Sequence, residues 1–123
     1  MARATQEVVI YHNPACTTSR KVLGLIRAAG VEPRVVQYLK TPPSRAELLG
    51  LLRRMGLSPR QLLRKRGTPY EKLGLANPSL SDEALVDAMQ AHPVLMERPV
   101  VVGPRGVRLC RPPERVHEVL PAS

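Results

Sequence analysis

The chain has 123 residues, a formal net charge of +9, two cysteines, three tyrosines and neither Phe nor Trp. This length suggests one domain with an aliphatic core, and two cysteines are too few for a disulfide scaffold or a zinc site, so no metal is expected. The scattered basic residues without aromatic neighbours argue against a nucleic-acid partner, and the absence of a signal peptide or a long apolar stretch predicts a cytoplasmic protein without a membrane span.

The first third of the chain is typical of a β-α-β unit. Residues 8–11 (VVIY) form a continuous apolar run that suits a buried strand, and residues 34–39 read as a second strand. Between the strands, apolar residues recur at the spacing of one helix face and a glycine closes the pattern: Val22, Leu25, Ile26, Ala29 and Gly30. The two strands should therefore be parallel, with a right-handed crossover.

Residues 42–97 read as a helical segment. Ser44 and Glu47 fit a capping box, Ser58 with the following proline begins a short helix, and Ser81 can cap a third helix. The apolar faces of these helices are expected to hold Leu48, Leu51, Leu52, Met55, Leu62, Leu63, Leu85, Val86 and Met89.

The last quarter of the chain predicts a hairpin followed by a helix. Residues 100–102 and 107–109 read as short strands that flank a GPRG turn at 103–106. The final helix should follow Pro112-Pro113 and carry Val116, Val119 and Leu120. The order of elements is then βαβ, helices and ββα, all within one domain over residues 1–123.

Cys16 stands where the first strand leads into the first helix, within IYHNPACTTSR at 10–20. Amides at the start of a helix stabilise a thiolate and bind oxyanions, so the pKa of Cys16 should lie below the ordinary value of about 8.5. These amides belong to Thr17, Thr18 and Ser19. Arg20 and His12 could add positive charge, and the Ser19 hydroxyl could donate a hydrogen bond to the sulfur. The alternatives are a buried small apolar residue for Cys16 and a plain strand end for His12.

The segment IYHNPACxTSR closely resembles the arsenate reductases that depend on glutathione and glutaredoxin, which have a thioredoxin fold. Further segments similar to that family are YLxTPP at 38–43, LLRK at 62–65, PYExLGLA at 69–76, HP at 92–93, RPxVV at 98–102 and RLCRP at 108–112. The resemblance implies an α/β thioredoxin-like fold (βαβ–ββα) with a four-stranded mixed sheet and a helical insertion, residues 42–97, between strands 2 and 3.

Carried over by position, the resemblance makes Cys16 the nucleophile, His12 the thiolate-stabilising histidine and Ser19 the serine that hydrogen-bonds the cysteine. Pro99 matches a proline that is cis in thioredoxin folds. The residues expected to bind substrate oxygens are Arg64, Arg98 and Arg111, with Thr17 and Thr18 at the helix start. The implied reaction reduces arsenate to arsenite through a Cys16–arsenic adduct, with glutathione as reductant, glutaredoxin as partner and no bound cofactor.

Two other interpretations stay open at this point. The first is a regulator of the Spx type, which binds RNA polymerase. It would keep the fold but would not need arginines that bind substrate oxygens. The second is an arsenate-reductase-like thiol protein that acts on another substrate. Cys110, the second thiol, ends a short strand where a small apolar side chain packs well, so we expect it to play no part in catalysis.

Overall fold

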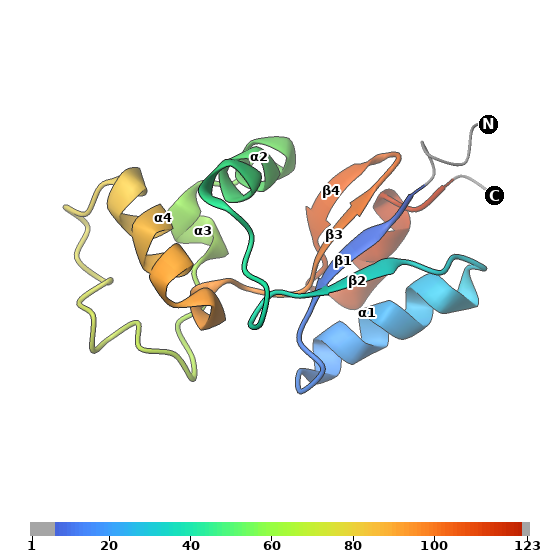
Figure 1. Ribbon diagram of the computed structural model, residues 1–123, viewed down its shortest axis with the longest axis horizontal. Coiled ribbons are helices and arrows are strands. Elements are labelled where there is room, and N and C mark those ends of the chain that lie inside the picture. The colour runs from blue at the N-terminus through green and yellow to red at the C-terminus, as the bar shows by residue number, and fades with distance from the viewer. Residues whose placement is uncertain (1–6, 122–123) are drawn as a thin grey trace. The chain divides into compact units, whose positions relative to one another are not determined.

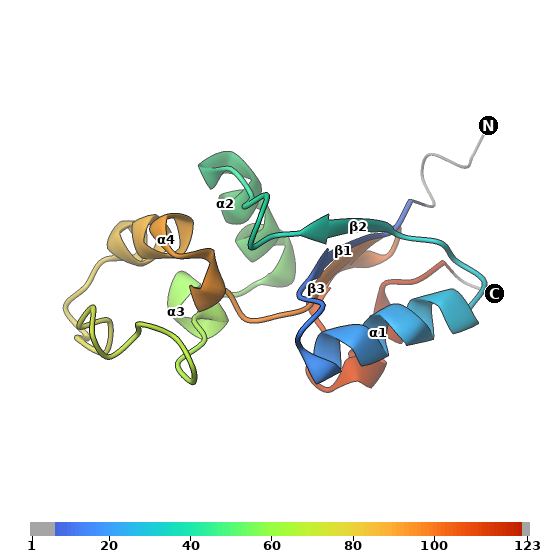
Figure 2. The same ribbon diagram turned by 60° about the horizontal axis from the view of Figure 1, so that its bottom comes forward.

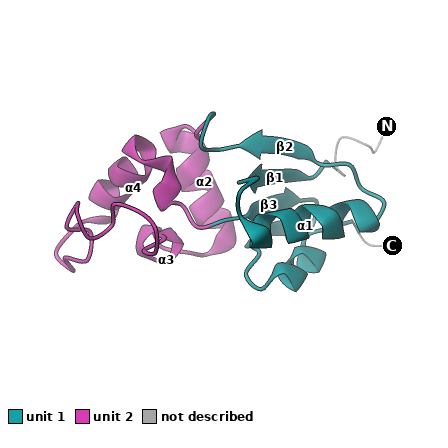
Figure 3. Cartoon of the chain, turned by 90° about the horizontal axis from the view of Figure 1, so that it is seen from below, with its two compact units in different colours: residues 1–41, 98–123 teal, residues 42–97 magenta. Residues whose placement is uncertain are grey.

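The computed structural model describes residues 7–121, so the outer bounds of the single domain expected over 1–123 lie outside the described part. The chain divides into two compact units, residues 1–41 with 98–123 and residues 42–97, which are coloured teal and magenta in Figure 3. The first unit carries the sheet, and the second carries the helices α2, α3 and α4.

The sheet unit contains a four-stranded mixed sheet with the order β2-β1-β3-β4 (Figure 1). The strands are β1 (Val9–His12), β2 (Arg34–Gln37), β3 (Val100–Gly103) and β4 (Gly106–Leu109). Strand β1 pairs parallel with β2 and antiparallel with β3, and β3 pairs antiparallel with β4. The parallel β1–β2 pair, the hairpin and the mixed sheet predicted from the sequence are thus confirmed. Strand β2 is shorter than predicted, since residues 38–39 do not pair with β1.

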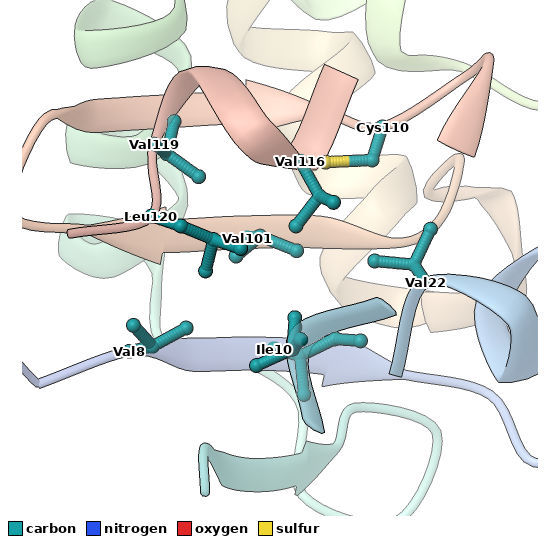
Figure 4. Packing of buried hydrophobic residues seen from close by; sticks show 9 residues of the cluster. Val8, Ile10, Val22, Val101, Cys110, Val116, Val119 and Leu120 are labelled. Atoms are coloured by element: carbon teal, nitrogen blue, oxygen red, sulfur yellow. The ribbon is translucent and has the colours of Figure 1, made fainter. Parts of the chain in front are cut away.

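Helix α1 (Thr17–Ala28) and the 3₁₀ helix η3 (Pro113–Glu118) pack against each other beside the sheet (Figure 2). Their side chains, those of β1 and β3 and those of the residues next to β1, β4 and η3 meet in an aliphatic core (Figure 4). This core consists of Val8, Ile10, Val22, Ile26, Val101, Cys110, Val116, Val119 and Leu120. Such a core needs neither Phe nor Trp and holds α1, and hence its first residue, firmly against the sheet.

Two sequence predictions need correction in this unit. The C-terminal helix is a 3₁₀ helix that ends at Glu118, although the three apolar residues predicted for it are buried. A proline at its start and a 3₁₀ geometry keep such segments short. Helix α1 ends at Ala28, so Ala29 is an exposed C-cap residue rather than part of the buried face.

Gly103 ends β3 where the chain passes closest to η3. A Cβ atom at Gly103 would clash with the backbone carbonyl oxygen of Val119 and lie 2.9 Å from the carbonyl carbon. The absence of a side chain therefore lets the hairpin and the C-terminal segment pack together.

In the helical unit, α4 (Asp82–Ala91) packs against α2 (Arg45–Met55), α3 (Pro59–Leu62) and the 3₁₀ helix η2 (Pro93–Leu95). The predicted caps are present: Ser44 and Glu47 form a reciprocal capping box, and Ser81 accepts from the amide of Ala84. The buried hydrophobic residues are Leu48, Leu51, Leu52, Leu62, Leu63, Tyr70, Leu75, Leu85, Val86, Met89, Leu95 and Met96. Within residues 7–121 no helix has the length and apolar character that a membrane crossing requires.

Candidate active site

Cys16 is the N-cap residue of α1, with extended backbone angles (φ −94°, ψ 122°). A tight turn carries the chain to it from the end of β1, because the amide of Cys16 donates to the carbonyl oxygen of Asn13 at 3.0 Å. Its own carbonyl oxygen accepts from the amide of Arg20 at 3.0 Å, which starts the helical bonding. The thiol is partly exposed, and the side chain itself makes no capping hydrogen bond.

The surroundings of the Cys16 sulfur favour the thiolate. Partial burial raises the pKa of this thiol, but the nearby backbone amides of Ser19 and Thr18 and the positive guanidinium of Arg98 favour the thiolate, outweigh burial and lower the pKa. The pKa therefore lies below its ordinary value, as the sequence predicted. Of the groups expected to favour the thiolate, the helix amides do so, and Arg98 adds to them.

Arg98 lies two residues before β3, and its positively charged guanidinium favours the thiolate form of the Cys16 sulfur. Its Nε and Nη1 atoms are buried and have no hydrogen-bond partner among residues 7–121. Buried donors without partners are costly in a folded protein, so they mark a place where an acceptor belongs. The Arg98–Pro99 peptide bond is cis, and Arg111 Nη1 donates to the carbonyl oxygen of Arg98 at 3.0 Å. Arg98 and Arg111, expected to act together, thus adjoin each other in the sheet unit.

His12 and Ser19 form a buried pair rather than direct partners of the sulfur. The distance between His12 Nδ1 and Ser19 Oγ is 2.6 Å, and the same oxygen accepts from the Asn13 amide at 3.1 Å. Burial lowers the pKa of His12, and Arg27 and Arg20 lower it further, so the imidazole is neutral at neutral pH. The structure therefore corrects the expectation that His12 adds positive charge. It also directs the Ser19 hydroxyl to His12, whereas the sequence suggested a bond to the sulfur.

Arg20 forms hydrogen bonds that stabilise the loop before Cys16. Its Nη1 donates to the carbonyl oxygen of Pro14 at 2.8 Å, and its Nη2 lies 3.4 Å from Thr17 Oγ1. The expected substrate contacts of Thr17 and Thr18 stay a prediction, although the Thr18 amide already reaches the sulfur.

Arg64 belongs to the helical unit, where it follows α3. Its Nη1 forms an ion pair of 2.9 Å with Glu97 Oε1, and both side chains are largely buried. Its amide donates to the carbonyl oxygen of Leu95 at 2.7 Å. The role expected for Arg64 in binding substrate oxygens stays a prediction, and its carboxylate partner was not anticipated from the sequence.

Cys110 lies in the core, fully buried, at the end of β4 (Figure 4). Burial raises its pKa to about 12, so this thiol stays protonated at neutral pH. Within residues 7–121, no group of three His, Cys, Asp or Glu side chains is arranged to hold a metal ion.

Asn13 is a polar residue of this loop that was not predicted to belong to the site. It is buried, and its amide, carbonyl oxygen and side-chain oxygen all take part in hydrogen bonds within residues 13–19. The available signal was the pair Asn-Pro, which is typical of a tight turn.

Together, the sheet order, the helix capped by Cys16 and the cis-proline segment before β3 define a thioredoxin-like protein with one partly exposed thiol at a helix start. Residues 11–119 match the ArsC family, and the chain belongs to this family.

Similar proteins support this assignment over most of the chain. An arsenate reductase of Rhizobium meliloti (strain 1021) is 60% identical over 114 residues, which are 93% of this chain and 81% of the relative. The uncharacterized protein YfgD of Escherichia coli (strain K12) is 50% identical over 117 residues, which are 94% of this chain and 98% of the relative. Among solved structures, an arsenate reductase from Vibrio cholerae matches with a TM-score of 0.89 and 46% sequence identity. This match covers 94% of the present chain and 98% of the Vibrio chain.

Proposed function

We propose that the chain is an arsenate reductase in which the Cys16 thiolate attacks arsenate. The observation that carries the proposal is Arg98, because its guanidinium lowers the pKa of the Cys16 thiol while two of its buried nitrogens lack hydrogen-bond partners. Arginine donates to tetrahedral oxyanions through adjacent N–H groups, so an arsenate held by Arg98 would lie against the sulfur. The relatives named arsenate reductase support the same substrate.

The proposed chemistry begins at the sulfur. The thiolate forms a bond to arsenic and one arsenate oxygen leaves as water or hydroxide, without a change of oxidation state. The thiolate of glutathione then attacks the Cys16 sulfur and forms a disulfide. The electron pair of the S–As bond stays with arsenic, which leaves as arsenite in oxidation state III. A glutaredoxin thiol takes the glutathione moiety and releases the Cys16 thiolate. This cycle belongs in the cytoplasm, where glutathione is reduced.

Glutathione and glutaredoxin are proposed because the chain lacks a thiol that can resolve Cys16 from within. Cys110 is fully buried and its pKa is raised to about 12. Phosphate has nearly the same shape and charge as arsenate, so discrimination lies in the sulfur–arsenic redox step rather than in binding alone.

The test is arsenite production by the purified full chain with arsenate, glutathione and glutaredoxin. We expect turnover that stops when any one of these components is omitted, and mass spectrometry of the trapped enzyme should find glutathione on Cys16. Turnover with thioredoxin alone, or an accumulating Cys16–Cys110 disulfide, would contradict the glutathione route.

A second candidate is an arsenate-reductase-like thiol protein with another substrate. It is favoured by the match to YfgD, which extends over 98% of that uncharacterized protein. The same assay decides between the two: no arsenite from a chain whose Cys16 still reacts as a thiolate would favour the second candidate.

A further inference from the structure

The loop that carries Cys16 contains a side-chain hydrogen bond that the proposed chemistry does not use. Asn13 Oδ1 accepts from the amide of Ala15 at 3.0 Å, and the carbonyl oxygen of Asn13 accepts from the amide of Cys16, also at 3.0 Å. The first bond is an Asx turn and the second closes the overlapping β-turn over residues 13–16, with Pro14 at its second position. Any residue can supply a backbone carbonyl, but only a side chain with an acceptor close to the backbone can supply the first bond.

We propose that Asn13 is a positioning residue, whose side-chain oxygen fixes the turn that holds the Cys16 sulfur against the amides of Thr18 and Ser19. Asn13 is placed for this role because it is 7% exposed and directly follows β1, the strand that anchors the loop. Its amide also donates to Ser19 Oγ, so one residue ties both ends of the segment from the strand to the first turn of α1. Without the Asx bond, the Ala15 amide and the Cys16 backbone gain freedom, and the sulfur spends less time at the helix amides.

The chain contains a second turn of the same construction. Asn77 Oδ1 accepts from the amide of Ser79 at 2.9 Å, and its carbonyl oxygen accepts from the amide of Leu80 at 3.2 Å. Pro78 occupies the position of Pro14, and a helix, α4, follows soon after. This turn lies in the helical unit, so it offers a matched control for the loss of an Asx bond.

The test measures the rate of alkylation of Cys16 by iodoacetamide as a function of pH, read by peptide mapping. The charged and titratable groups near Cys16 in the sheet unit are Arg98, before β3, Arg111, bonded to the Arg98 carbonyl, and Arg20 and His12 at the loop. Asn13→Ala leaves all four in place, so a shift of the midpoint reports the position of the sulfur rather than a lost charge.

We expect Asn13→Ala to raise the alkylation midpoint by about half a unit to one unit, because the thiolate loses part of its contact with the amides. Asn13→Ser should give an intermediate midpoint, since a hydroxyl makes the same turn more weakly. Asn77→Ala should lower thermal stability and leave the Cys16 midpoint unchanged.

An Asn13→Ala protein that melts earlier but keeps the wild-type midpoint would overturn the proposal, because Asn13 would then only stabilise the fold. An equal shift in Asn77→Ala would overturn it too. If Asn13→Ala does not fold, Asn13→Ser decides: a raised midpoint supports the proposal and a wild-type midpoint refutes it. The proposal rests on the role proposed for Cys16 as the reacting thiol, but alkylation needs no arsenate. It can therefore fail while arsenate reduction stands, and the reverse also holds.

Discussion

Replacing Arg98 should separate the electrostatic part of the Cys16 site from its helix amides. In the variant Arg98→Gln, the sulfur loses the guanidinium that favours its thiolate form, but it keeps the nearby amides of Ser19 and Thr18. A hydrogen bond to a charged group contributes about 1.5–3 kcal/mol, and one pKa unit corresponds to about 1.36 kcal/mol. Full loss would thus raise the thiol pKa by about one to two units. Because the sulfur is partly exposed and solvent screens the charge, we expect about one unit.

The assay is again the pH dependence of Cys16 alkylation, now with and without sulfate. Wild-type protein should be protected by sulfate, since the anion would occupy the donors of Arg98 that lack partners. Arg98→Gln should lose both the low midpoint and the protection. The matched control is Arg27→Gln, which removes the same charge from the same unit but from an exposed ion pair with Glu32. An Arg98→Gln protein with the wild-type midpoint, or an equal effect of Arg27→Gln, would refute the assignment of Arg98.

Other predictions concern the two thiols, His12 and Gly103. Cys16→Ser should abolish arsenite production while Cys110→Ser keeps most of it, and full activity of Cys16→Ser would refute the nucleophile. The pKa of His12 is lowered in the folded chain, so the unfolded chain binds the proton more readily below about pH 6.5. The free energy of unfolding should therefore fall as the pH drops through this range, and a pH titration of His12→Gln should show a smaller slope. Gly103→Ala should destabilise the fold by about 1–3 kcal/mol, since the new Cβ meets the Val119 backbone; an unchanged melting temperature would contradict this packing.

The parts of the fold that could be predicted are those set by local sequence. Ser44 with Glu47 caps α2, because both partners of a capping box lie within one turn of each other. The alternation between apolar runs and helical spacing likewise predicted β1, α1 and the hairpin. The 3₁₀ form of residues 113–118 could not be predicted, because the same apolar spacing suits both kinds of helix over so short a segment.

The site was less predictable because its properties arise from burial and from contacts distant in sequence. Cys16 could be found from its place before a helix, and Arg98 from its resemblance to a family position. The effect of Arg98 on the Cys16 thiolate, and its two nitrogens without partners, depend on a segment that is 82 residues away from the loop along the chain. The neutral state of His12 follows from burial and from the charges of Arg27 and Arg20, which no local pattern reports.

Ser19 bears on how the Cys16 thiolate is regenerated in the proposed reaction. It stands where a C-x-x-C pair would have its second thiol, and its side chain is fully buried with Oγ between His12 Nδ1 and the Asn13 amide. A sulfur atom is a weaker hydrogen-bond donor and acceptor than a hydroxyl oxygen, so a cysteine at 19 would loosen the bonds that anchor the loop. The same hydroxyl that holds the loop in place therefore removes the internal reductant. With Cys110 protonated in the core, the proposed reaction takes the electrons that regenerate Cys16 from a second molecule, which can reach the partly exposed sulfur.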